Sequence, residues 1–200
     1  MATVVTGQAN INGASLYYEM TGAGSPVVLL HGLDVDHRMW DEQVAPLAHA
    51  HTVVRYDLRG SGRSTAAGER GSHAEDLRAL LDHLELVGVS LLGFSLGGGA
   101  AIDFAVAYPN AVRALILVYP SIEGPATARL GDVTAPTLVA VGELDTQDAR
   151  EMASTLEAGI PDAWKVMIPG AGRTVNVDDP KRFNEIVMAF LAETERKSRR

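Results

Sequence analysis

The chain has 200 residues, of which 46% are hydrophobic and 21% are charged, and its formal net charge is −8. This length favours one domain over residues 1–200 with a single buried core, and the acidic balance argues against nucleic-acid binding. The chain has no cysteine, which excludes disulfides and cysteine-bound metals and fits a reducing compartment. It shows no signal-peptide pattern and no apolar run near the roughly 18 residues of a membrane span. We therefore expect a cytoplasmic protein.

Predicted strands and helices alternate along most of the chain. Segments 4–11 and 14–20 read as strands joined at Asn12-Gly13, a strong hairpin signal. Later apolar runs and helical periodicities predict strands at 27–30, 51–57, 89–94, 111–119, 137–141 and 164–168, and helices at 39–48, 72–86, 97–107, 148–158 and 181–193. The alternation indicates an α/β fold with a mostly parallel, eight-stranded sheet that is flanked by helices and has an antiparallel hairpin at its N-terminal edge. Ligands of such sheets bind beyond the carboxyl ends of the strands.

The clearest chemical signal is a G-x-S-x-G motif. Residues 93–97 read GFSLG, at the end of a predicted strand and the start of an apolar, small-residue helix. This setting suits a nucleophile elbow, in which a sharp turn lifts the Ser95 hydroxyl above the sheet. The helix N-terminus adds unpaired N–H groups suited to an oxyanion. The alternative is a glycine-rich turn with an incidental serine, and the strand–turn–helix setting favours the elbow.

Three further motifs surround this one in the chain. Residues 31–33 read HGL after a predicted strand, residues 57–64 read DLRGSGRS, and residues 141–145 read VGELD. Together with GFSLG, and in this order, they resemble the motifs of the α/β-hydrolase family, which includes esterase- and lipase-like serine hydrolases. The resemblance extends over nearly the whole chain.

The resemblance implies a role for each matched residue. Ser95 would be the nucleophile and Asp145 the acid, while the backbone N–H groups of Leu33 and Leu96 would form the oxyanion hole. His31, Gly32, Trp40 and Ile122 are expected to border the substrate, although core packing is an alternative role for Trp40. The resemblance implies neither a cofactor nor a metal.

The family's last motif departs from the pattern at one position. The family has G-x-G-H, an acidic residue five positions later, and then x-P-x-x-F. This chain reads IPGAGRTVNVDDP over residues 168–180, followed by Phe183, so Arg173 stands where the histidine base belongs. A serine hydroxyl needs a base to accept its proton, and arginine is always protonated. We expect Arg173 to pair with Asp145 instead.

No histidine follows Ser95 to replace the missing base. His31 lies in the oxyanion segment, where the family's histidine holds the loop in place. His37 lies on the loop above the site and is the alternative base, whereas His49, His51, His73 and His83 read as helix-end or surface residues. The segment HGLDVDH partly matches the metal motif H-x-H-x-D-H, but Gly32 and Asp34 occupy two of its histidine positions, so no metal site is predicted.

The predicted cleft has no cap. Many members of the family insert a helical cap after the strand that follows the elbow helix, whereas only residues 120–136 are available here. We expect a compact, lidless hydrolase with a shallow cleft that accepts bulky or varied acyl groups.

The predicted function is hydrolysis of a small-molecule carboxylic ester, impaired by Arg173. Two alternatives stay open. One is a binding protein on a hydrolase scaffold, in which Arg173 captures an anion such as a carboxylate. The other is an enzyme that uses another base, such as His37, or that runs a non-hydrolytic reaction on the same oxyanion hole.

Overall fold

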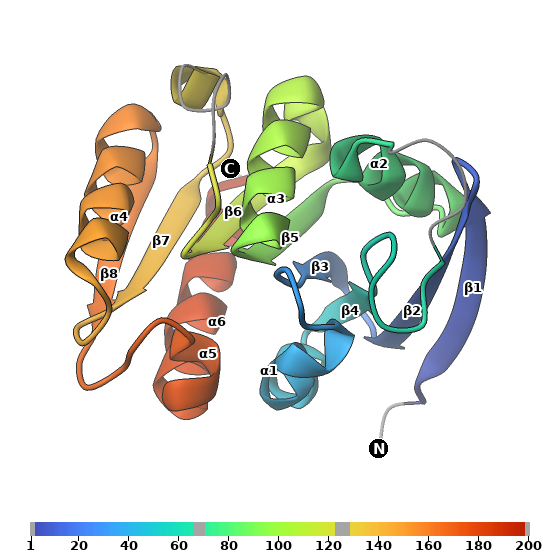
Figure 1. Ribbon diagram of the computed structural model, residues 1–200, viewed down its shortest axis with the longest axis horizontal. Helices are drawn as coiled ribbons and strands as arrows, with labels where there is room; N and C mark the ends of the chain where they lie inside the picture. Colours follow the sequence, from blue (N-terminus) through green and yellow to red (C-terminus); the bar gives the residue numbers. More distant parts are fainter. Residues whose placement is uncertain (1–2, 66–70, 123–128, 199–200) are drawn as a thin grey trace.

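The computed structural model describes residues 3–65, 71–122 and 129–198. Its strands form one eight-stranded sheet in the order β1-β2-β4-β3-β5-β6-β7-β8 (Figure 1). β2 pairs antiparallel with both β1 and β4, and the remaining neighbours are parallel. The strands are β1 (Val5–Ile11), β2 (Ala14–Gly22), β3 (Ser25–Leu30), β4 (His51–Tyr56), β5 (Val89–Phe94), β6 (Val112–Val118), β7 (Thr137–Gly142) and β8 (Ala163–Ile168). The predicted fold class is confirmed.

Helices cover both faces of this sheet (Figure 1). They are η1 (His37–Trp40), α1 (Asp41–Leu47), α2 (His73–His83), α3 (Leu96–Ala107), η2 (Pro109–Ala111), α4 (Gln147–Gly159), α5 (Val175–Asp178) and α6 (Pro180–Ser198). Buried side chains of α2, α3 and α4 form one core layer with the sheet. Those of η1, α1, α5 and α6 form a second core layer on the other face. None of the helices in the described ranges has the length and hydropathy needed to cross a membrane.

Local sequence accounts for the ends of several elements. Asn12 and Gly13 both have positive φ, 46° and 73°, as the tight turn of the predicted hairpin requires. The Ser72 hydroxyl accepts a hydrogen bond from the N–H of Ala74 and caps α2. Thr146 caps α4 in the same way through the N–H of Ala149.

The C-terminal region differs most from the sequence prediction. The four-residue helix α5 lies in a segment where no element was predicted, because it is too short to show periodicity. α6 begins at Pro180 and continues to Ser198, five residues beyond the predicted end. Near the other end of the chain, the predicted helix 39–48 is divided into a 3₁₀ turn, η1, and the helix α1.

Candidate active site

Ser95 lies in a strained turn between β5 and α3. Its φ is 48° and its ψ is −114°, a conformation that residues other than glycine rarely adopt. Its N–H donates to the carbonyl of Val118 at 3.0 Å, and its carbonyl accepts from the N–H of Ser121 at 2.9 Å. These bonds tie the turn to the end of β6 and hold the strain in place.

The two glycines of the motif allow the turn to pack against neighbouring backbone. A Cβ on Gly93 would lie 2.5 Å from the carbonyl oxygen of Gly97, and one on Gly97 would overlap the carbonyl of Leu30 at the end of β3. A side chain at either position would therefore push α3 away from the sheet. The backbone has the geometry expected of a nucleophile elbow.

The segment after β3 runs directly beside Ser95. A Cβ on Gly32 would lie only 3.3 Å from the Cβ of Ser95. Among the described residues, the backbone N–H groups of Leu33 and Leu96 donate no hydrogen bond. Leu96 follows Ser95 directly in the chain, and Leu33 follows Gly32, whose backbone runs beside the serine.

His31 anchors this segment. Its side chain is fully buried, its Nε2 accepts from the N–H of Leu58 at 2.8 Å, and its Nδ1 lies 2.7 Å from the carbonyl of Gly32. These partners require a neutral ring with the proton on Nδ1, and burial lowers the pKa of His31. His31 therefore links the loops after β3 and β4, as expected of a histidine that holds the oxyanion segment.

His37 points its ring nitrogens at two carboxylates. Its Nδ1 lies 2.7 Å from Asp57, its Nε2 lies 3.4 Å from Glu19, and its side chain is almost completely buried. Asp57 also accepts from the backbone N–H groups of His37 and Arg63, at 2.8 and 2.7 Å. With both nitrogens engaged in this way, His37 is not positioned to take a proton from Ser95.

The same loops hold a cluster with the spacing of a metal site. Ligand atoms of Asp36, His37 and Asp57 lie within 4.8 Å of one another. Asp36, however, accepts three hydrogen bonds from the guanidinium of Arg38, at 2.7, 2.9 and 3.1 Å, and these bonds lower its pKa. Because the carboxylates already have internal donors, hydrogen bonding accounts for the cluster.

Asp145 and Arg173 meet beyond the ends of β7 and β8. Asp145 is buried, and its Oδ1 accepts from the N–H of Thr146 at 2.7 Å and lies 3.6 Å from Nε of Arg173. The Arg173 side chain is 47% exposed, and its guanidinium carbon lies 4.2 Å from the ring centroid of Tyr119. The pairing expected from the sequence is present, and Tyr119 is a partner that sequence reasoning missed.

Backbone hydrogen bonds bring these two loops together. The N–H of Leu144 donates to the carbonyl of Ala171 at 2.8 Å, and a Cβ on Gly142 would overlap the carbonyl of Gly172. Asp178, five residues after Arg173, accepts from the N–H of Gly172 at 2.8 Å. The residues flanking Arg173 thus have structural roles that fix its position.

The other predicted substrate-binding residues lie in different surroundings. Trp40 is fully buried among core residues, and Ile122 is only 8% exposed. Instead, three apolar side chains near predicted site residues in the chain are exposed: Leu33 follows Gly32, Leu144 precedes Asp145, and Val177 lies on α5, four residues after Arg173. The expected absence of a cap concerns residues 120–136, of which 123–128 lie outside the described residues.

Comparison with known proteins places this geometry in context. Residues 25–129 match the family model of the alpha/beta hydrolase fold. The chain is 35% identical to a putative non-heme chloroperoxidase of Synechocystis sp. over 60% of this chain and 45% of that protein. It is 25% identical to a putative carbamate hydrolase of Azorhizobium caulinodans over 90% of this chain and 96% of that protein. The chain spans 33% and 43% of the length of two further curated relatives, an uncharacterized protein of Mycobacterium bovis and a soluble epoxide hydrolase of Corynebacterium sp..

Solved structures agree in fold. The enol-lactonase of Burkholderia xenovorans superposes with a TM-score of 0.87 at 20% identity, covering 93% of this chain and 100% of that chain. A thermophilic esterase of Thermogutta terrifontis gives 0.84 at 22% identity, covering 95% and 99%.

Proposed function

Because the chain belongs to the α/β-hydrolase family and its fold supports hydrolysis, we propose that it hydrolyses carboxylic esters through Ser95 at a rate limited by Arg173. The observation that carries this proposal is the 3.6 Å approach of Arg173 to Asp145 at the position of the base. The acid of a catalytic triad is present, and the residue it should orient is a cation.

Each proposed step follows from a described group. The Ser95 hydroxyl attacks the ester carbonyl, and the N–H groups of Leu33 and Leu96 bind the oxyanion that forms. The serine proton passes to solvent, because Arg173 has no acceptor site. The intermediate then collapses, its C–O bond to the alcohol breaks, and the departing alkoxide takes a proton from solvent. Water next attacks the acyl group on Ser95, the Ser95 ester bond breaks, and the carboxylic acid leaves as the serine hydroxyl regains a proton. The oxyanion hole and substrate binding then supply the acceleration that remains without a base, on the order of 10³–10⁴-fold over water.

The proposed substrates are small esters with an apolar acyl or alcohol group. The exposed side chains of Leu33, Leu144 and Val177 offer apolar contact around the site. The short connection between β6 and β7 supports an open cleft in a single, capless domain over residues 1–200. The neighbours described as an esterase and an enol-lactonase act on this class of bond.

Restoring the base tests the proposal. Arg173→His places an imidazole beside Asp145, so we expect kcat/KM for p-nitrophenyl butyrate to rise at least about 100-fold, since removing a triad member costs far more than this. Ser95→Ala in the Arg173→His background is the control and should abolish the gain. Activity that stays at the parent level in a folded Arg173→His variant would contradict the proposal.

A second candidate function is anion binding without turnover. Arg173 is half-exposed and stacks on Tyr119, an arrangement that presents a rigid guanidinium to a carboxylate. This function predicts that butyrate raises the melting temperature of the parent chain but not of Arg173→Ala, and that a fluorophosphonate does not label Ser95. Strong labelling of Ser95 would favour the hydrolase.

A further inference from the structure

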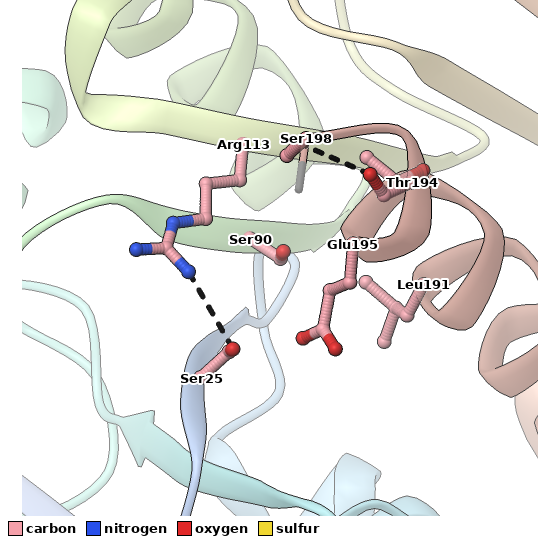
Figure 2. A pocket seen from close by; sticks show the side chains of 7 residues that line it. All are labelled: Ser25, Ser90, Arg113, Leu191, Thr194, Glu195 and Ser198. Atoms are coloured by element: carbon pink, nitrogen blue, oxygen red, sulfur yellow. Dashed lines mark hydrogen bonds between the residues drawn. The ribbon is translucent and has the colours of Figure 1, made fainter. Parts of the chain in front are cut away.

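A hollow lies at the edge of the sheet where the parallel strands begin, here called the amino edge, away from Ser95. Its walls come from the first residues of β3, β5 and β6 and the last turns of α6 (Figure 2). Its volume is about 340 Å³, within the range of small-molecule sites. Ser90, near the start of β5, lines it, whereas Ser95 follows the end of that strand. Five residues of strand separate the two by about 16 Å.

Arg113 supplies a positive charge to this hollow. It is the second residue of β6, and its Nη1 lies 3.5 Å from the hydroxyl of Ser25, the first residue of β3. A Cβ on Gly88 would lie 2.6 Å from Nε of Arg113, so this glycine leaves room for the guanidinium to cross the edge of the sheet. Within the described residues, Arg113 forms no ion pair and has the weak contact to Ser25 as its one hydrogen bond.

Glu195 supplies a negative charge from α6. Its one ion-pair contact among the described residues is with Nδ1 of His51, at 3.6 Å, and this contact is an ion pair only when His51 is protonated. His51 is buried at the start of β4, directly beside Ser25 in the sheet, and its Nδ1 has no hydrogen-bond partner. In the part of the chain that the structure describes, the Glu195 carboxylate therefore accepts no hydrogen bond.

The two charges face one space but do not meet. In Figure 2 the guanidinium of Arg113 and the carboxylate of Glu195 stand on either side of the hydroxyls of Ser25 and Ser90. They form no ion pair with each other, and Leu191 adds an apolar wall on the side of α6. The hollow thus presents a guanidinium that can bind an anion and a carboxylate that can bind a cation. Two serine hydroxyls lie between them, and a leucine adds an aliphatic surface.

We propose that this hollow binds a small zwitterion, an α-amino acid with an aliphatic side chain. Its carboxylate pairs with Arg113, its ammonium group pairs with Glu195, and its side chain packs on Leu191. Such a ligand meets the guanidinium of Arg113, which forms no ion pair among the described residues, and the carboxylate of Glu195, which accepts no hydrogen bond there. Charge-assisted hydrogen bonds of this kind are stronger than neutral ones. The site is distinct from the Ser95 centre and does not depend on the hydrolase proposal.

Titration of the full-length, ¹⁵N-labelled chain with L-leucine tests the proposal. We expect amide shifts at Ser25, Ser90, Arg113 and Glu195, and little change near Ser95. 4-Methylpentanoate lacks the ammonium group and 3-methylbutylamine lacks the carboxylate, so each should bind at least about tenfold more weakly than L-leucine. Shifts confined to the Ser95 side, no shifts up to the solubility of L-leucine, or equal binding of a singly charged analogue would each overturn the proposal.

Charge-neutralising variants complete the test. Arg113→Gln and Glu195→Gln should each weaken L-leucine binding at least about tenfold. Arg78→Gln and Glu193→Gln make the same changes in exposed ion pairs elsewhere and should leave it unchanged. All four variants should hydrolyse esters like the parent chain, which separates this site from the hydrolase site. Undiminished binding in both Arg113→Gln and Glu195→Gln would contradict the proposal.

Discussion

The loop after β3 and the loop after β8 contribute the two halves of the candidate active site, and they are held by different forces. The first contains His31, whose ring has no exposed surface and bonds at both nitrogens. The second contains Arg173, whose side chain is 47% exposed and makes one loose ion pair and one stacking contact. Changing His31 disturbs the packing of two loops, whereas changing Arg173 disturbs mostly solvent-exposed contacts.

This difference bears on the proposal that Arg173 stands in the place of a base. Arg173 is half-exposed whereas its partner Asp145 is buried, and Asp145 keeps its hydrogen bond from the Thr146 N–H when residue 173 is changed. Buried polar groups cost more to disturb, because they lose hydrogen bonds that water cannot replace. Position 173, where we propose that a base is missing, is therefore expected to tolerate substitution better than His31.

The largest expected effect comes from Asp145→Asn, examined in two backgrounds. Combined with Arg173→His, it should lower kcat for p-nitrophenyl butyrate by about 10⁴-fold, because a neutral amide neither orients the imidazole nor stabilises its cation. In the parent chain, where Arg173 accepts no proton, the same change should alter kcat less than about threefold, because Asp145 has no base to orient and the effects of residues that act as a unit are not additive. Equal losses in the two backgrounds would show that Asp145 acts independently of residue 173.

A smaller effect is expected from Gly32→Ala in the Arg173→His background. The new Cβ would lie 2.7 Å from the ring of Phe94 and 3.3 Å from the Cβ of Ser95, so the segment that carries the Leu33 N–H must shift. Loss of one oxyanion donor lowers kcat by about 10²–10³-fold.

Gly131→Ala is the matched control for this variant. A Cβ at Gly131 meets nothing within 4 Å, so kcat should not change. Thermal melting followed by circular dichroism checks that both variants fold. A folded Gly32→Ala variant with unchanged kcat would place the oxyanion hole elsewhere.

The smallest expected effect is a pH dependence of stability that originates at His31. Burial lowers its pKa in the folded state below its ordinary value of 6.5. Below pH 6.5 the unfolded chain therefore binds a proton that the folded chain does not. The free energy of unfolding then falls with decreasing pH, by up to about 1.4 kcal/mol per pH unit, until the lowered folded-state pKa is reached.

Urea denaturation between pH 7 and about pH 5 measures this dependence. His31→Asn should be less stable at neutral pH and should show a shallower slope, with a residual slope from His73, whose pKa burial also lowers. His49→Asn, at an exposed position, should keep the slope of the parent chain. A parent-like slope in His31→Asn would mean that His31 is not the group that titrates.

Much of the candidate site follows from short motifs because their backbone demands are local. A serine between Gly93 and Gly97 at a strand–helix junction predicts the strained turn that the structure shows at Ser95. The motif around Arg173 predicts its pairing with Asp145, which the structure shows. The sequence predicts the length of α6 and the presence of α5 less well, because helix ends and single turns carry little periodicity.

The sequence does not predict which side chains from distant segments contact one another. Nothing near Tyr119 in the chain indicates that its ring lies under Arg173, and nothing near His37 indicates that it pairs with Asp57 and Glu19. The hollow at the amino edge is a further case, since Ser25, Arg113 and Glu195 are far apart in the chain. These contacts depend on the order of strands in the sheet.

The sequence by itself determined the class of fold, the motif that carries Ser95 and the arginine at the place of a base, because hydrophobic alternation and glycine-dependent turns act over a few residues. Only the tertiary structure decided which histidine rings are held by hydrogen bonds, what Arg173 contacts and where Arg113 and Glu195 face the same hollow. Those outcomes arise when the order β1-β2-β4-β3-β5-β6-β7-β8 brings loops from distant parts of the chain to the same edge of the sheet.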